Sequence, residues 1–258
     1  MEDGMREVAV EAAMEAGKIL RDGFRGDKKV KKKADGSMVT QVDVMAEQKI
    51  ISMIKAKYPG HDFLAEESGE AKISSRYRWI IDPLDGTHDF IYGIESFGVS
   101  IALEENGQLA LGVIYMPMQD RMFVAQKGKG AFLNGEKISV SKRKNMWETV
   151  MLYDPCIFKE KALALEVLGM IVDKIRTIRI FGSAVMKMTT IAMGAADSYI
   201  EWGNKPWDSA AGAILIEEAG GKVTQPDGKP YTPYCRHFVA SNGKVHEEVL
   251  RIISEAQR

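Results

Sequence analysis

The sequence predicts an α+β protein in which helices and mixed or antiparallel β-sheets lie in layers. Near the start of the chain, apolar residues recur at helical spacing. From Arg76 onward, short apolar runs separated by turn signals replace this pattern. In the second half, such runs alternate with further helical segments. This mixed order favours layered sheets and helices over a doubly wound parallel sheet.

Two helices are expected before the first long strand. The first covers residues 5–24, and the second follows Asp43 and stops at Pro59-Gly60. Residues 29–36 between them are expected to form a loop. Its lysines form either a solvated surface or a positive charge that steers an anionic substrate; they are Lys29, Lys31, Lys32 and Lys33.

Strands dominate the middle of the chain and mixed elements follow. The expected strands are Tyr77–Ile81, Phe97–Leu103, Leu109–Tyr115 and Met122–Ala125. Asn134-Gly135 predicts a hairpin between residues 131–133 and 137–140. Beyond it we expect helices at 159–173, 183–193 and 209–219 and from Val245, and strands at 176–180 and 198–202, near Val223 and at 238–240.

No repeat or long linker interrupts the sequence, so residues 1–258 are predicted to form one domain, with two α/β halves meeting near residue 143. The 35 basic and 36 acidic residues nearly cancel, which argues against a nucleic-acid or membrane partner chosen by bulk charge. Cys156 and Cys235 lack the spacing of a zinc site or disulfide framework and are expected to be reduced thiols. Neither an apolar leader nor a membrane-spanning run is evident, so a cytoplasmic location is expected.

The most informative motif is Asp82-Pro83-Leu84-Asp85-Gly86-Thr87. An apolar strand ends there in two carboxylates on a turn stiffened by proline, so both can point into one small volume. Two close carboxylates repel each other unless a cation lies between them. Hard oxygen ligands suit magnesium or manganese rather than zinc. The structural alternative is a surface turn.

Three further acidic elements accompany this motif, and each has a structural alternative. Glu66-Glu67 could form a solvated loop, and Asp43 could be a helix N-cap. Asp208, in Pro206-Trp207-Asp208, could cap the next helix in the same way. Their combination with residues 82–87 favours a metal site.

Together these motifs resemble the inositol monophosphatase family, within the lithium-sensitive, magnesium-dependent phosphatase superfamily that also includes fructose-1,6-bisphosphatases and 3′-phosphoadenosine 5′-phosphate phosphatases. The resemblance runs through almost the whole chain: residues 35–43, Ala65-Glu66-Glu67-Ser68, residues 79–87, Lys205-Pro206-Trp207-Asp208, Ala210-Ala211-Gly212 and residues 217–221. It implies a layered α-β-α-β-α sandwich of the sugar-phosphatase type. It also implies that residues 1–143 carry the metal and phosphate core, and residues 144–258 the substrate side and Asp208.

The resemblance further implies two or three magnesium ions, with manganese as a possible substitute. Glu66, Asp82 and the Leu84 carbonyl would hold one ion, and Asp82, Asp85 and Asp208 a second; a third would bind weakly near Glu66. The ions would activate a water and stabilise the leaving oxygen. Thr87, oriented by Asp43, would position that water, and Glu66 would help accept its proton.

Substrate contacts are also implied on both sides of the site. If a helix starts at Gly86, the backbone N–H groups of residues 86–88 would point at the phosphate. The substrate-contact set is Asp85, Gly86, Thr87, His88, Gly182, Ser183, Ala184, Glu201 and Asp208. Departures from the inositol phosphatase pattern occur at Ser37, at His88-Asp89 and at Asn204-Lys205, and they leave the substrate open.

The resulting hypothesis is magnesium-dependent hydrolysis of a small phosphate monoester, with inositol 1-phosphate or a related polyol or sugar phosphate as substrate. The alternative substrates are fructose 1,6-bisphosphate (alone or as a second activity), histidinol phosphate and 3′-phosphoadenosine 5′-phosphate. A silent metal-binding or regulatory homologue is the non-enzyme alternative. A P-loop or haloacid-type phosphotransferase is disfavoured, because neither G-x-x-x-x-G-K-[ST] nor D-x-D-x-T occurs. Lithium sensitivity and a homodimer are implied by the resemblance alone.

Overall fold

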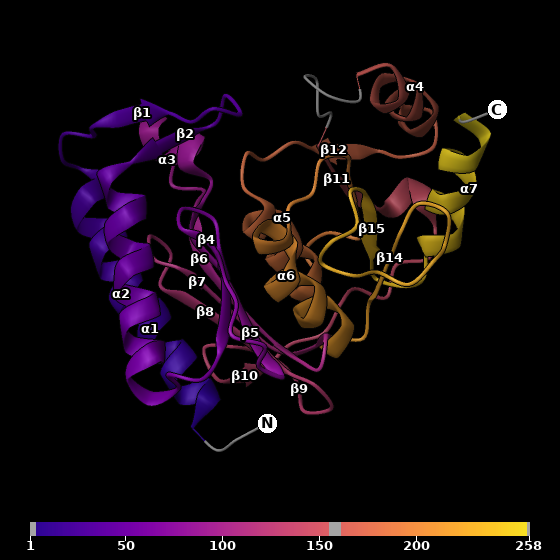
Figure 1. Cartoon of the computed structure of the whole chain (residues 1–258). Helices are drawn as coiled ribbons and strands as arrows, with labels where there is room; N and C mark the ends of the chain where they lie inside the picture. The colour runs from indigo at the N-terminus through magenta and orange to yellow at the C-terminus, as the bar shows by residue number, and fades with distance from the viewer. Residues whose placement is uncertain (1–3, 155–160, 257–258) are drawn as a thin grey trace.

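The computed structural model describes residues 4–154 and 161–256 and arranges them in five layers, α-β-α-β-α (Figure 1). Helices form both outer layers and the central layer, and two β-sheets lie between them. The outer helices are α1 (Met5–Phe24) and α2 (Gln41–Lys57) on one side and α4 (Lys161–Val172) and α7 (His246–Ala256) on the other; the central helices are α5 (Ala184–Ala192) and α6 (Pro206–Glu218). The predicted fold class, α+β with mixed and antiparallel sheets, is confirmed.

The first sheet has eight strands in the order β10-β9-β8-β7-β6-β5-β3-β4. Neighbouring strands are antiparallel except β3 and β5, which are parallel. The strands are β3 (Asp62–Ala65), β4 (Gly69–Ala71), β5 (Tyr77–Asp85), β6 (Gly98–Glu105), β7 (Gln108–Met116), β8 (Arg121–Gln126), β9 (Gly130–Leu133) and β10 (Glu136–Lys137).

The second sheet has five strands in the order β12-β11-β13-β15-β14. Strand β11 is parallel to both β12 and β13, whereas β15 is antiparallel to both of its neighbours. The strands are β11 (Val150–Tyr153), β12 (Thr177–Arg179), β13 (Ser198–Glu201), β14 (Lys222–Thr224) and β15 (Phe238–Ser241). The short elements outside the two sheets are β1 (Val30–Lys32), β2 (Met38–Thr40), α3 (Thr87–Tyr92) and a 3₁₀ turn at Met146–Glu148.

Burial explains why the helices differ in composition. The outer helix α1 is amphipathic: it packs Val8, Ala12 and Leu20 against the first sheet and exposes charged residues elsewhere. The central helix α6 lies between the two sheets, so residues 209–216 are all buried and the helix is apolar on nearly every side. This placement carries the first turn of α6, with Asp208, to the centre of the molecule.

Several local predictions need correction. Residues 30–32 of the expected loop pair with β2, and strands β3, β4 and β11 were missing from the sequence prediction. The hairpin at Asn134-Gly135 is present, but its second strand ends at Lys137 rather than Val140. Short strands of this kind depend on pairing partners far along the chain, which local sequence does not reveal.

The N-cap interpretation was wrong for both aspartates. The N-cap of α2 is Thr40, and Asp43 accepts a hydrogen bond from its backbone N–H at 2.9 Å. The N-cap of α6 is Lys205, and Asp208 stands three residues further on. The start of the helix predicted from Lys159 and the thiol of Cys156 lie outside the described residues, whereas Cys235 carries a free thiol. Within the described chain, no helix is both long enough and apolar enough to cross a membrane.

Candidate active site

Strand β5 is irregular where it carries the acidic motif. Asp82 pairs with Ser100 and Asp85 with Gly98, so three steps along β5 oppose two steps along β6. Pro83 has no N–H to donate to the ladder, which explains why the pairing breaks here. In a regular strand, residues three apart point to opposite faces of the sheet. The extra residue of this bulge lets Asp82 and Asp85 turn toward the same side.

Three carboxylates meet at this bulge. Asp82, Asp85 and Asp208 each offer an oxygen, and the three oxygens lie within 4.8 Å of one another. Asp82 is 1% exposed and Asp85 is 6% exposed. No basic side chain among residues 4–154 and 161–256 forms an ion pair with any of the three. These hard oxygen donors fit a magnesium- or manganese-sized cation. Because Asp82 and Asp85 are buried, the surface-turn alternative is wrong.

The raised pKa values of Asp82 and Asp208 also favour a cation site at these carboxylates. Burial raises the pKa of Asp82 well above its usual range, and the charges of Glu66 and Asp85 raise it further. Burial and the charge of Asp85 likewise raise the pKa of Asp208. A bound divalent cation would reverse these shifts, because it stabilises the charged form of each carboxylate.

Asp85 also anchors the central helix α5. Its carboxylate accepts hydrogen bonds from the hydroxyl of Ser183 and from the backbone N–H groups of Ala184 and Val185, the latter two at 3.1 Å. These contacts satisfy donors in the first turn of the helix and favour the charged carboxylate. Burial nevertheless raises the pKa of Asp85 to about 6. Ser183 itself is completely buried behind this carboxylate.

Helix α3 (Thr87–Tyr92) begins at the last residue of the acidic motif, with Gly86 as its N-cap, so the condition set for the backbone N–H groups of residues 86–88 is met. Gly86 has φ +89°, and a Cβ atom there would lie 2.7 Å from the carbonyl oxygen of Ser96, so glycine is required. The Thr87 hydroxyl oxygen lies 3.2 Å from Asp43 Oδ1 and 3.0 Å from the Leu84 carbonyl oxygen. Asp43 is completely buried, which raises its pKa, and it accepts a 2.6 Å hydrogen bond from the Thr40 hydroxyl.

Glu66 reaches the same place from the end of β3. Its backbone N–H donates to the Ile81 carbonyl at 3.1 Å, which continues the pairing of β3 with β5. Lys33 lies 2.9 Å from Glu66 and 2.7 Å from Glu67, and the two glutamate side chains are only 13% and 9% exposed. The solvated-loop alternative for Glu66-Glu67 is therefore wrong. Lys29, Lys31 and Lys32 of the basic stretch are exposed.

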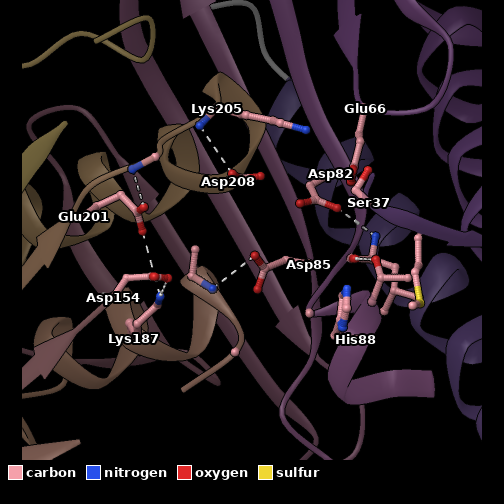
Figure 2. Close-up of a pocket in the computed structure, with 17 residues that line it drawn as sticks. Ser37, Glu66, Asp82, Asp85, His88, Asp154, Lys187, Glu201, Lys205 and Asp208 are labelled. Atoms are coloured by element: carbon pink, nitrogen blue, oxygen red, sulfur yellow. Dashed lines mark hydrogen bonds and ion pairs between the residues drawn. The ribbon is translucent and has the colours of Figure 1, made fainter. Parts of the chain in front are cut away.

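A cavity of about 330 Å³ connects these groups (Figure 2). Figure 2 shows Asp82, Asp85 and Asp208 at its centre, Glu66 and Ser37 at one end, and Asp154, Lys187 and Glu201 at the other. The predicted site residues that line it are Glu66, Asp82, Leu84, Asp85, Gly86, Thr87, His88, Gly182, Ala184, Glu201 and Asp208. Asp43 and Ser183 do not line the cavity; they contact Thr87 and Asp85 from behind.

Some lining residues were missing from the predicted set, namely Ser37, Met38, Asp154, Lys187, Gly203 and Lys205. Lys187 left a signal in the sequence, because it is the one charged residue of helix α5, whose other residues are apolar or threonine. Asp154 left none, since its position depends on the second sheet. Asp89 does not line the cavity: its carboxylate lies against Gly182, where a Cβ atom would come within 2.5 Å of Asp89 Oδ1.

Comparison with known proteins agrees with this geometry. Residues 1–258 match the sequence profile of the inositol monophosphatase family. Inositol monophosphatase 2 of Solanum lycopersicum is 34% identical over 97% of this chain and 98% of its own length. The fructose-1,6-bisphosphatase/inositol-1-monophosphatase of Thermotoga maritima is 35% identical, covering 90% of this chain and 88% of its own. The crystal structure of the extragenic suppressor protein suhB from Bartonella henselae superimposes with a TM-score of 0.93, at 34% identity over 96% of this chain and 98% of that one.

Removing one of the buried charges should stabilise the metal-free protein. Asp82→Asn retains an acceptor for the Leu84 N–H but eliminates repulsion with Asp85 and Asp208. We expect the free energy of unfolding in EDTA to rise by about 1–2 kcal/mol. Magnesium should raise the Tm of the wild-type protein more than that of the variant, as measured by calorimetry.

Asp62→Asn is the matched control. Asp62 is also buried, but it accepts backbone hydrogen bonds from Ile73 at 2.6 Å and Ser75 at 3.2 Å. Burial raises its pKa, yet these hydrogen bonds outweigh that effect and the net pKa is lowered. The control should therefore lose stability, and a loss of similar size in Asp82→Asn would contradict the repulsion argument.

The metal-free protein should also show a pH dependence centred on Asp85. Its folded pKa of about 6 lies above the unfolded value near 3.9, so the folded state binds more protons between these values. This contribution to stability therefore grows as pH falls through 6 and is complete below about 4. Urea unfolding in EDTA at several pH values should show a contribution of about 3 kcal/mol from Asp85. An Asp85→Asn variant with the wild-type pH dependence would contradict the assignment.

Proposed function

The chain belongs to the inositol monophosphatase family, as its motifs predict, and on this premise we propose that it hydrolyses inositol 1-phosphate or a related polyol or sugar phosphate. The family's enzymes are phosphoric monoester hydrolases. The observation that carries the proposal is the meeting of three carboxylates, two of them buried and none with a basic partner in the described structure, in a cavity that Thr87 also lines. Asp43 contacts Thr87 from behind this cavity.

We assign two metal positions to the donors at the bulge. Glu66, Asp82 and the Leu84 carbonyl would hold one magnesium, and Asp82, Asp85 and Asp208 a second; a third would bind near Glu66, and manganese could substitute. Bound there, the ions would neutralise phosphate charge, lower the pKa of a water and stabilise the leaving oxygen. Within 4.8 Å, the triad is compact enough for one carboxylate to serve both positions.

Thr87 positions the attacking water in this proposal. A charged Asp43 and the Leu84 carbonyl can only accept hydrogen bonds, so the Thr87 hydroxyl donates to one of them. Its lone pairs then face the cavity and can accept a hydrogen bond from the water, which directs the water's own lone pair toward phosphorus. Glu66 lines the same cavity and would help accept the proton.

The remaining contacts come from both parts of the chain. The backbone N–H groups of residues 86–88, at the start of α3, would bind phosphate oxygens, with His88 beside them. Gly182, Ala184 and Glu201 would contact the leaving group, and Ser183 would act through Asp85. Because the cavity requires residues from both 1–143 and 144–258, we propose a single catalytic domain. A homodimer, lithium sensitivity and a cytoplasmic location complete the proposal.

A second candidate activity is hydrolysis of fructose 1,6-bisphosphate. It is favoured by the 35% identity to the Thermotoga maritima fructose-1,6-bisphosphatase/inositol-1-monophosphatase. The two activities need not exclude each other, because the metal and phosphate core would be shared.

A substrate panel tests the proposal directly. Phosphate release from inositol 1-phosphate should require magnesium and fall on addition of lithium. Asp208→Asn should reduce kcat/KM about a thousandfold while the protein remains folded by circular dichroism. Asp227→Asn, at an exposed turn of the same half, should behave as wild type. Undiminished turnover by Asp208→Asn, or no magnesium-dependent release from any phosphate monoester, would contradict the proposal.

Thr87 offers a separate test of the water-positioning role. Thr87→Val preserves shape but removes the hydroxyl, and should lower kcat about a hundredfold with little change in KM. Thr87→Ser should keep most of the activity. Thr190→Val serves as the control, because that hydroxyl only bonds the Met186 carbonyl within α5. A Thr87→Val enzyme with normal kcat would rule out this role.

A further inference from the structure

A buried lysine faces the cavity at the end away from Glu66, and the proposed mechanism does not use it. Lys187 lies on α5 and is 1% exposed, yet it lines the cavity (Figure 2). Its ammonium nitrogen lies 2.8 Å from Asp154 Oδ2 and 3.9 Å from Glu201 Oε2. It also lies 4.7 Å from the centre of the Tyr199 ring. Three elements, β13, α5 and the end of β11, thus bring one cation and two carboxylates together.

The physical cost of burying an ammonium indicates what this lysine does. An isolated buried charge is strongly unfavourable, so a buried lysine is retained only where anionic partners compensate it. Burial lowers the pKa of Lys187, but the charges of Glu201 and Asp154 outweigh this effect and the net pKa is raised. Lys187 is therefore a cation between two carboxylates.

Glu201 is held from several directions at once. One oxygen accepts a 2.8 Å hydrogen bond from the Gly203 backbone N–H, and the other accepts one from the Tyr199 hydroxyl. Burial raises the pKa of Glu201, and the charge of Lys187 is the largest influence that opposes this. Without Lys187, the carboxylate would lose both a positional restraint and the cation that keeps it charged.

The sum of charges at this end decides which leaving group fits. Asp154 and Glu201 carry two negative charges and Lys187 one positive charge, so these three side chains are together net negative. Charged carboxylates accept hydrogen bonds and cannot donate them, which suits the hydroxyl groups of a substrate. A second phosphate placed here would face like charges in a buried setting.

We propose that Lys187 is a positioning and specificity-determining residue: it holds Asp154 and Glu201 as paired hydroxyl acceptors and thereby selects a neutral, polyhydroxylated leaving group over one carrying a second phosphate. This inference rests on the proposed phosphatase function and deepens it, because it names the side chain that selects among leaving groups.

The test compares substrates that differ only in the leaving group. Wild-type protein and Lys187→Met are assayed with inositol 1-phosphate, with fructose 1,6-bisphosphate and with phenyl phosphate, whose leaving group has no neighbouring hydroxyls. The wild-type enzyme should prefer inositol 1-phosphate to the bisphosphate. In Lys187→Met the ratio of kcat/KM for inositol 1-phosphate to that for phenyl phosphate should fall about tenfold, mainly through KM.

A double-mutant cycle shows whether Lys187 acts through Glu201. Glu201→Gln alone should lower the same ratio, and adding Lys187→Met should lower it little further. If Lys187→Met does not fold, Asp154→Asn takes its place. Asp154 is the partly exposed partner of Lys187, and its substitution leaves helix α5 unchanged. It should also lower the ratio. Lys244→Met, at an exposed position, is the control lysine substitution.

Three other outcomes of these assays would overturn the inference. An equal fall for inositol 1-phosphate and phenyl phosphate would show that Lys187 has only a structural role. A selective loss of bisphosphate turnover in Lys187→Met would show that the ammonium binds a second phosphate. A wild-type protein inactive on the whole panel would overturn the proposed function itself, and the inference with it.

Discussion

The repulsion among Asp82, Asp85 and Asp208 is the constraint on which the rest of the site depends. Oxygens of the three carboxylates lie within 4.8 Å of one another, with Asp82 and Asp85 buried and Asp208 half-buried, and the described structure pairs none of them with a basic side chain. Such an arrangement is unfavourable unless a cation is bound. The surrounding elements therefore have to hold the three groups together against their own charge.

The backbone around the three carboxylates holds them in place. The bulge at Pro83 turns Asp82 and Asp85 to the same side of β5. Asp85 is fixed by donors in the first turn of α5. Asp208 is fixed in the first turn of α6 by the backbone N–H of Lys205, at 3.3 Å. Because α5 and α6 form the central layer, the metal site also joins the two sheets, and metal binding and global stability should be coupled.

The two ends of the cavity have different chemistry for a physical reason. At the end near Glu66, Thr87 and the start of α3 offer a hydroxyl and backbone N–H groups suited to water and phosphate. At the other end, Lys187 compensates two carboxylates, which leaves a fixed set of hydrogen-bond acceptors. In the proposed function, the phosphate and the leaving group are therefore distinguished by whether the protein offers hydrogen-bond donors or acceptors.

The sequence by itself determined the long amphipathic helices and the acidic motif, because helical periodicity and the Asp82–Thr87 turn are local properties. It also indicated Glu66 and Asp208 as candidate site residues, since their motifs occur together, and both line the cavity. The contact between Asp43 and Thr87, 44 residues apart, was implied only by the family resemblance, and the tertiary structure shows it. Only the tertiary structure decided that Ser183 supports Asp85, 98 residues away. The group Asp154, Lys187 and Glu201 arises in the same way, from strands and a helix that meet only when both sheets have formed. Local sequence indicates secondary-structure propensity and residue type. The position of a buried charged side chain depends instead on partners from distant parts of the chain, which come together only on folding.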